Sequence, residues 1–334
     1  MSCRLTAFIG AVLALILVSL AQQSVFGQIP SSPKAAAWTP PRTPDGHPDL
    51  QGFWTNVTIT PFERPSELGE KQFLTPEEAS ALEKQVVQTR VDRAPPPGDP
   101  GGYNEFWFDR GTKVVGTRRT SLVVDPPNGR IPPLTPQAQD RVEKTRAAAR
   151  QRPAEGPESR SLPERCLLWP TAGPPMLPAG YNSMYQIVQA PGYVMILTEM
   201  IHDARIIPLD GRPHLAPDVR QWMGDSRGRW EGDTLIIDSS NFTSKTSFRG
   251  SSENLHLVEK FTRTSPETIL YQFTVDDPEA FTRGWSVELS MTKSPGPLFE
   301  YACNEGNYAL KDILAGARAE ERKAAEEASR KVSQ

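Results

Sequence analysis

The last third of the chain alternates between apolar and polar positions. The alternation is regular over residues 268–275, 285–291 and 299–303. Since successive side chains of a β-strand point to opposite faces, a period of two predicts strands that each bury one face. The expected buried positions are Ile269, Tyr271, Phe273 and Val275, then Trp285, Val287, Leu289 and Met291, and then Phe299, Tyr301 and Cys303. Strands with one buried face and short connections favour an antiparallel meander.

Shorter apolar runs between turn residues predict further strands. Residues 183–189 and 193–199 flank a Pro-Gly turn, which is typical of a hairpin. A second hairpin is expected where the segment ending at Trp230 leads through Glu-Gly-Asp into residues 234–238. The other predicted strands are residues 50–60, 121–125, 206–207 and 255–263.

Three segments carry helix signals. Thr75 precedes a proline and two glutamates, a pattern that predicts an N-cap and a helix running to about residue 91. Thr135 precedes another proline and predicts a second helix to about residue 150. Residues 310–332 are highly charged with little apolar stripe, so we expect a third helix at the surface.

The predicted fold class is mainly β. Strands with one buried face must wrap around a common core, so we expect an antiparallel meander that closes into a barrel-like, lipocalin-like sheet with peripheral helices. A β-sandwich is the alternative. A propeller is disfavoured because the chain has no repeat of blade length.

The N-terminus predicts an exported protein. Arg4 precedes a continuous apolar stretch over residues 7–20, and small or polar residues follow through Gly27, as in a secretory signal peptide spanning residues 1–27. The stretch is shorter than the roughly 20 residues of a membrane span, although an uncleaved anchor is the alternative. No later segment approaches that length, so no membrane span is expected after cleavage. The mature protein is expected in the periplasm or outside the cell.

The expected organisation of the mature chain follows from these segments. An extended arm over residues 28–45 precedes an N-terminal part, 46–160, with two helices and short strands. A β-meander core, 161–308, and a charged C-terminal helix, 309–334, complete the chain. Residues 46–308 are expected to form one domain.

Charge and cysteine content narrow the partners. The formal net charge is −3 and no long basic run exists, which argues against nucleic acid as a partner. Cys166 and Cys303 remain after signal cleavage, and in an oxidising compartment such a pair is most simply a disulfide. Two buried thiols are the alternative. The oligomeric state stays open.

Strand parity brings three glutamates onto apolar faces. Glu199 follows the face of Tyr193, Met195 and Leu197, and Glu305 and Asn307 continue that of residues 299–303 if the strand persists. Glu259 lies among apolar neighbours, with Arg263 beyond. A carboxyl buried among apolar groups has a raised pKa, which suits acid or base chemistry. The alternative is that Glu199 and Glu305 lie in water at strand ends, while Glu259 pairs with Arg263 or Lys260.

Residues 199–214 are dense in polar groups. A histidine near a carboxylate can transfer protons, so we predict Glu199, His202 and Glu305 as catalytic residues. Arginines suit oxyanion recognition, and the predicted ligand-binding residues here are Arg205, Asp210, Arg212 and His214. Local ion pairs within turns are the alternative. Glu199, His202 and His214 could in principle bind zinc, but their spacing matches no strong template, so we predict no metal and no cofactor.

A second dense segment, residues 103–110, interleaves aromatic and polar side chains. It could line a ligand cavity through Asn104, Trp107 and Arg110, or anchor the core. Together with Glu259, Arg263 and Asn307, these complete the predicted ligand-binding set. No G-x-S-x-G, P-loop, G-x-G-x-x-G or C-x-x-C-H motif occurs, so the common hydrolase, nucleotide and cytochrome classes lack support.

Four motifs carry a resemblance. They are T-P-D-G-H-P-D-L-Q-G-F-W at residues 43–54, D-G-R-P-H at 210–214, W-E-G-D-T-L-I-I-D at 230–238 and Y-A-C-N-E-G-N at 301–307. With these motifs the chain resembles a family of exported proteins of environmental bacteria that has no settled activity. The resemblance implies a periplasmic or secreted bacterial protein and transfers no catalytic residue.

Three functions are compatible with these patterns. The first is binding of a small, partly apolar organic molecule in a pocket at one mouth of the barrel, with the polar groups above at its polar end. The second is an enzyme that uses the same pocket for acid or base chemistry in a lyase, isomerase or hydrolase step. The third is a structural or interaction module of the cell envelope.

Overall fold

The computed structural model describes residues 38–91, 96–98, 105–151, 154–246 and 248–332. The predicted signal peptide, most of the predicted arm and Asn104 lie outside these residues. All elements below belong to one compact unit, Pro40–Gln334.

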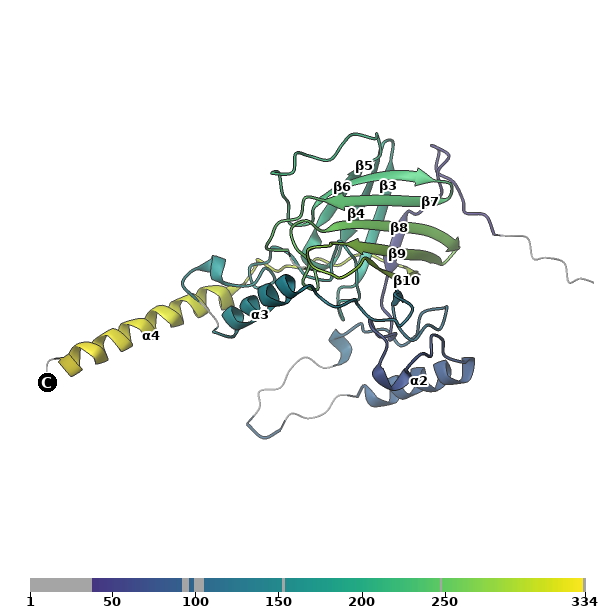
Figure 1. The fold of residues 1–334 in the computed structure, drawn as a ribbon. Coiled ribbons are helices and arrows are strands. Elements are labelled where there is room, and N and C mark those ends of the chain that lie inside the picture. Colours follow the sequence, from purple (N-terminus) through teal and green to yellow (C-terminus); the bar gives the residue numbers. More distant parts are fainter. Residues whose placement is uncertain (1–37, 92–95, 99–104, 152–153, 247, 333–334) are drawn as a thin grey trace, which may run out of the picture. The chain divides into compact units, whose positions relative to one another are not determined.

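The described residues form one antiparallel sheet of ten strands, which confirms the predicted meander (Figure 1). The strand order is β5-β4-β3-β1-β10-β9-β8-β7-β6, and β2 also pairs with β10. Figure 1 shows β7 and β8 crossing in front of β3 and β4, so the sheet curves over on itself. The strands are β1 (Gly52–Thr55), β2 (Val123–Asp125), β3 (Met184–Ala190), β4 (Tyr193–Thr198), β5 (Ala204–Pro208), β6 (Asp225–Glu231), β7 (Thr234–Ser240), β8 (His256–Ser265), β9 (Thr268–Asp276) and β10 (Trp285–Ser294).

The predicted closure into a barrel is wrong. The edge strands β5 and β6 have no ladder between them in the described part of the chain, and no second sheet forms there as a sandwich would need. The edges instead touch through side chains. A Cβ at Gly228 of β6 would lie 2.5 Å from Leu209 Cδ2 and 2.9 Å from Ile207 Cγ2. Pro208 ends β5 and lacks an N–H, so it cannot donate a ladder hydrogen bond to β6 at this point.

Strand parity is confirmed on β8, β9 and β10. Their buried side chains alternate as expected, from Leu257 to Arg263 on β8 and from Trp285 to Met291 on β10. Tyr271 and Phe273 of β9 lie on the same buried face. This face carries the main core, where Trp285 contacts the rings of Phe273 and Phe281, among others.

Parity is wrong on β4. The buried side chains are Val194, Ile196 and Thr198, whereas Tyr193 is 40% exposed. The run Y-V-M-I-L is apolar at both parities, so its pattern does not distinguish the two faces. The choice comes from pairing, because Ile196 lies opposite the buried Ile187 of β3.

The predicted strand at residues 299–303 is also wrong. β10 ends at Ser294, and residues 299–303 follow as an irregular segment in which Phe299 is 67% exposed. The break comes at Pro295-Gly-Pro297, where two prolines remove ladder donors. The phase expected for Glu305 and Asn307 is therefore lost.

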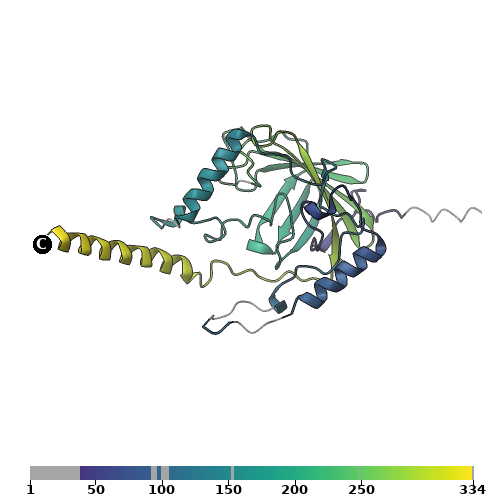
Figure 2. The ribbon, with the colours of Figure 1, turned by 60° about the horizontal axis from the view of Figure 1, so that its bottom comes forward.

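The three predicted helices are confirmed as α2 (Pro76–Thr89), α3 (Pro136–Arg150) and α4 (Tyr308–Val332). Thr75 and Glu78 form the reciprocal capping box of α2. Thr135 Oγ1 accepts from the N–H of Ala138 at the start of α3. Figure 2 shows α2 and α3 at separate positions around the strands. Short 3-10 helices occur at Ser66–Leu68 (η1), Glu105–Trp107 (η2), Pro157–Ser159 (η3) and Met200–His202 (η4).

The predicted disulfide is confirmed. Cys166 and Cys303 are bridged with a Cα–Cα distance of 5.7 Å and a sequence separation of 137. The bridge ties the segment before β3 to the segment after β10. In the chain-entropy description a loop of this size stabilises a fold by up to about 5 kcal/mol. Within the described residues, the helices are too short or too polar for one of them to span a bilayer.

Candidate functional site

A pocket of about 630 Å³ opens where the two edges of the sheet separate. We call it the seam pocket. It is lined by residues 203–206 at the β5 edge, by residues 220–226 leading into β6, and by Leu167 and Thr243. The contact of Gly228 with Ile207 holds the edges together beyond the pocket, so the opening is confined to one end of the seam.

A buried ion pair stands behind the pocket. Arg205, 5% exposed, donates from Nη1 to Glu259 Oε1 at 3.2 Å and from Nη2 to Oε2 at 2.5 Å. Glu259 of β8 is 0% exposed. Tyr271 Oη also donates to Oε1 at 2.7 Å and accepts from the N–H of Met176 at 3.0 Å. Burial, together with the charge of Glu259, raises the pKa of Tyr271 well above its ordinary value, so its hydroxyl remains a donor.

The same guanidinium links both edges of the sheet. Arg205 Nη2 donates to Ser226 Oγ of β6 at 3.2 Å, and Ser226 Oγ lies 2.8 Å from Ser239 Oγ of β7. We call Arg205, Ser226, Glu259 and Tyr271 the inner cluster. Parity correctly placed Glu259 on the apolar face, and Arg205 was a predicted site residue. The roles of Ser226 and Tyr271 were missed, because each looks like an ordinary strand residue.

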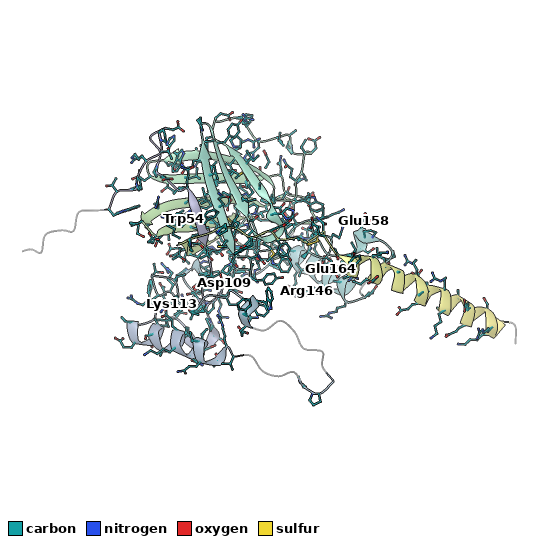
Figure 3. All side chains as sticks on the ribbon, turned by 180° about the vertical axis from the view of Figure 1, so that it is seen from behind. Trp54, Asp109, Lys113, Arg146, Glu158 and Glu164 are labelled. Carbon is teal, nitrogen blue, oxygen red and sulfur yellow. A yellow bond between two sulfur atoms is a disulfide. The ribbon has the colours of Figure 1, made fainter. Side chains whose placement is uncertain are left out.

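The partners considered for Glu259 from the sequence do not bind it. Lys260 is exposed on the opposite face. Arg263 donates to the main-chain oxygens of Asp49 at 2.6 Å and Pro266 at 2.9 Å, and its guanidinium lies 5.5 Å from the ring of Trp54. Trp54 is labelled among the strands in Figure 3. Arg263 therefore lies on the same buried face as Glu259 but outside the seam pocket.

Asp203 lines the seam pocket with a carboxyl that has no hydrogen-bond partner among the described residues. The turn after β4 positions it, because Thr198 donates to the main-chain oxygen of Asp203 from both N–H and Oγ1, at 2.9 and 2.8 Å. Within this turn Ile201 has φ 64°, a strained conformation for a β-branched residue. Burial raises the pKa of Asp203, and the nearby charge of His202 acts in the opposite direction.

Two buried polar atoms beside the pocket lack hydrogen-bond partners in the described part of the chain. They are Asp203 Oδ2 and Arg205 Nε, an acceptor and a donor. Buried polar atoms of folded proteins nearly always have a partner, so an exception asks for a physical explanation. Neither atom is reached by solvent, although both side chains line the pocket.

His214 lies on the opposite face of the same strands. Its Nδ1 lies 3.0 Å from Asp225 Oδ2 and its Nε2 lies 3.0 Å from Asp238 Oδ1. His256 Nε2 lies 2.8 Å from Asp238 Oδ2. We call these four residues the outer cluster. Arg227, beside this cluster, donates from Nη1 to Asp225 Oδ1 at 2.5 Å.

Contacts within the outer cluster shift the pKa values of Asp238 and His256 in opposite directions. Burial acts to raise the pKa of Asp238, but the bonds and charges of His256 and His214 outweigh it, so the pKa is lowered. The bond with Asp238 raises the pKa of His256, and burial opposes this rise. His214 also belongs to the connection that supplies one wall of the seam pocket. Its bonds, and the bond from the N–H of Leu215 to Asp225 Oδ2 at 2.9 Å, fasten that connection to the sheet.

The predicted catalytic residues do not line one cavity. Glu199 Oε1 accepts from the N–H of Phe299 at 3.0 Å, and His202 Nδ1 lies 3.1 Å from the main-chain oxygen of Tyr301. Both side chains hold the segment after β10. Glu305 is exposed and lines a separate cavity of about 470 Å³ beside the disulfide.

Asn307 lines that second cavity with Glu305. Its Nδ2 donates to the main-chain oxygen of Glu164 at 3.1 Å. Figure 3 labels Glu164 near the start of α4. Asp210 and Arg212 form an exposed pair in a turn, where the bonds from Arg212 lower the pKa of Asp210 to about 2. These residues lie outside the lining of the seam pocket.

The aromatic segment supplies a third location. Trp107 is 61% exposed, and the guanidinium of Arg110 lies 3.8 Å from the ring centre of Phe108. Arg110 also lines a cavity of about 540 Å³ near α2, together with Lys113. Of the predicted site residues that the structure describes, only Arg205 lines the seam pocket, with Glu259 directly behind it.

The comparisons give no further assignment. The chain matches no protein-family model, no curated protein and no solved structure. In the described ranges, no group of three or more His, Cys, Asp or Glu side chains is placed to hold a metal ion.

Proposed function

We propose that the protein is an exported binding protein that takes up a small, partly apolar organic molecule in the seam pocket. The polar end of the pocket is formed by Asp203, Arg205 and Ser226. Trp222 and Met223 supply apolar surface. Concave sites where a few polar groups converge beside apolar surface are typical of small-molecule binding, and here polar groups make up the larger share of the exposed lining.

One observation carries the proposal: a buried ion pair, Arg205–Glu259, lies at the seam pocket. Moving two charges out of water is costly, and replacing a buried pair by apolar residues is often neutral or stabilising. Arg205 nonetheless lines the seam pocket, with Glu259 behind it and Tyr271 fixing Glu259 by a hydrogen bond. A fixed guanidinium edge is useful for orienting a polar ligand, and it has no evident value for packing alone.

Export is part of the same proposal. The signal-peptide pattern of residues 1–27 supports it, and the disulfide is in keeping with an oxidising compartment. The location in the periplasm or outside the cell is testable by cell fractionation, since a cytoplasmic protein would remain with the soluble contents of the cell.

The binding function is tested by recovering the ligand. The purified protein is incubated with a bacterial extract, and native mass spectrometry records any bound small molecule. Ala204→Trp places an indole at an exposed position of the pocket wall. We expect the variant to lower the recovered ligand by about tenfold or more, since the indole occupies volume that the ligand needs.

Thr112→Trp is the matched control, because Thr112 is exposed and lines the cavity near α2 instead. Equal recovery from the two variants would place the ligand outside the seam pocket and contradict the proposal. Recovery of no small molecule by the unaltered protein would favour the remaining alternative, a structural or interaction module.

An enzyme that uses the same pocket is the second candidate. The raised pKa of Asp203 supports it, because a partly buried carboxyl can act as a general acid or base. In that case the recovered compound is converted by the unaltered protein, and Asp203→Glu, which moves the carboxyl by one methylene, lowers kcat far more than it raises KM. A ligand that is released unchanged on prolonged incubation would argue for binding alone.

A further inference from the structure

We propose that the molecule bound in the seam pocket is an organic cation, a primary amine or similar protonated nitrogen base, with the carboxylate of Asp203 as its counter-ion. This inference rests on the proposed function and adds the chemical class of the ligand. It follows from the balance of charge in the pocket wall.

Four charged side chains line the pocket within the described residues, and three of them already have a counter-ion. Arg205 pairs with Glu259 at 2.5 Å. Asp225 pairs with Arg227 at 2.5 Å and with His214 at 3.0 Å.

The third is Arg220. Its Nε lies 3.8 Å from Glu253 Oε2, and its Nη1 donates to the main-chain oxygen of Phe242 at 3.1 Å. The two arginines of the wall are thus already committed to protein acceptors, and neither supplies a spare positive charge for an anion.

Asp203 is the fourth charged side chain. Within the described part of the chain its carboxyl forms no ion pair and accepts no hydrogen bond. The charge that acts on its pKa is that of His202, which is exposed and whose Nδ1 faces the main-chain oxygen of Tyr301 at 3.1 Å. When the imidazole is neutral, the pocket wall carries one uncompensated negative charge.

An ammonium group suits this charge. Its N–H groups can donate to the Asp203 carboxylate through Oδ1, since Oδ2 is buried, and a charge-assisted bond is about twice as strong as a neutral one. An anion would be repelled by Asp203, and a neutral hydroxyl would form only an ordinary hydrogen bond. Trp222 lines the same pocket, and an indole attracts a cation more strongly than it attracts a neutral group.

Three probes of similar shape and different charge test the proposal: benzylammonium, benzyl alcohol and benzoate. The readout is the indole N–H resonance of Trp222 in the nitrogen–proton NMR spectrum at neutral pH, assigned with Trp222→Phe. We expect benzylammonium to shift this resonance at the lowest concentration. Asp203→Asn, which keeps the shape and removes the charge, should weaken that binding by about 10- to 100-fold.

Asp218→Asn is the matched control, because Asp218 is exposed in the same connection, lies outside the pocket lining and changes the net charge equally. It should leave the affinity unchanged. The inference is overturned if benzyl alcohol or benzoate binds as tightly as benzylammonium, if none of the three probes shifts Trp222, or if the two variants behave alike.

These outcomes separate the ligand class from the proposed function. A neutral or anionic compound recovered from extracts and blocked by Ala204→Trp would leave the binding function intact and remove the cation. A failure of every extract and every probe would remove both.

Discussion

The inner and outer clusters use neighbouring residues of the same strands in two different ways. Asp225 and Ser226 are adjacent in β6, yet one joins the outer cluster and the other the inner cluster. In the inner cluster charges are sealed from water and matched by fixed partners, so the loss of one partner leaves a buried charge. In the outer cluster Asp225 is buried, but His214, Asp238 and His256 are partly exposed, and ion pairs within reach of solvent contribute little.

The largest loss of stability is expected when the carboxylate of the inner cluster is replaced. Glu259→Gln removes the negative charge that balances Arg205, so we expect the free energy of unfolding to fall by about 3–5 kcal/mol. Urea denaturation followed by tryptophan fluorescence, with the disulfide intact, measures the change. Glu231→Gln, at an exposed carboxylate that pairs with Arg229, should change stability by less than about 1 kcal/mol.

Removing both charges sharpens the same test. Arg205→Met combined with Glu259→Leu should recover most of the stability that Glu259→Gln loses, because the buried charge is no longer unbalanced. A double variant as unstable as the single one would show that the pair itself, and not its imbalance, stabilises the fold.

A smaller effect is expected at the tyrosine of the inner cluster. Tyr271→Phe removes a donor from Glu259 and an acceptor from the N–H of Met176, which should cost about 1.5–3 kcal/mol. Tyr185→Phe is the control, because Tyr185 is equally buried but its closest bond, from Asn56, is 3.3 Å long. Equal losses in the same denaturation assay would mean that ring packing and not the bond to Glu259 is being measured.

The smallest effect is expected in the outer cluster, and it depends on pH. The lowered pKa of Asp238 gives a contribution present above its ordinary value of 3.8 and lost as the pH falls through the folded value. The raised pKa of His256 gives one present below its ordinary value of 6.5 and lost as the pH rises through the folded value. Asp238→Asn should therefore destabilise by no more than about 1 kcal/mol, chiefly between about pH 4 and 6.5.

Unfolding curves of the parent protein and Asp238→Asn, recorded across this pH range, measure the difference. Because Asp238 and His256 are partly exposed, added salt should reduce it. A difference that grows steadily toward alkaline pH would rule out the histidine contribution.

Local patterns were sufficient for much of the fold. Alternation on β8, β9 and β10 predicted which side chains are buried, because those strands are polar on one face and apolar on the other. Thr75 and Thr135 predicted the two helix starts through bonds made within one turn. Where both faces are apolar, as on β4, the same reasoning failed.

The candidate site depended on contacts between distant residues. Arg205 and Glu259 are 54 residues apart and meet only because the sheet curves until β5 faces β8. No spacing rule in the sequence links them, and Lys260 or Arg263 was the more obvious partner. Asp203 was passed over for a related reason, since an aspartate in a turn is common and its burial is not visible in the sequence.

The amino-acid sequence by itself therefore determined the strands with one buried face, the helix starts and the choice of the two cysteines for a bridge. Each of these is set by short-range stereochemistry or by elimination. Tertiary structure alone decided that the sheet stays open at β5 and β6, that a pocket lies in this seam, and that Asp203 is left without a counter-ion among the described residues there. Closure and charge balance depend on how distant edges meet in space, and that geometry is a property of the whole fold.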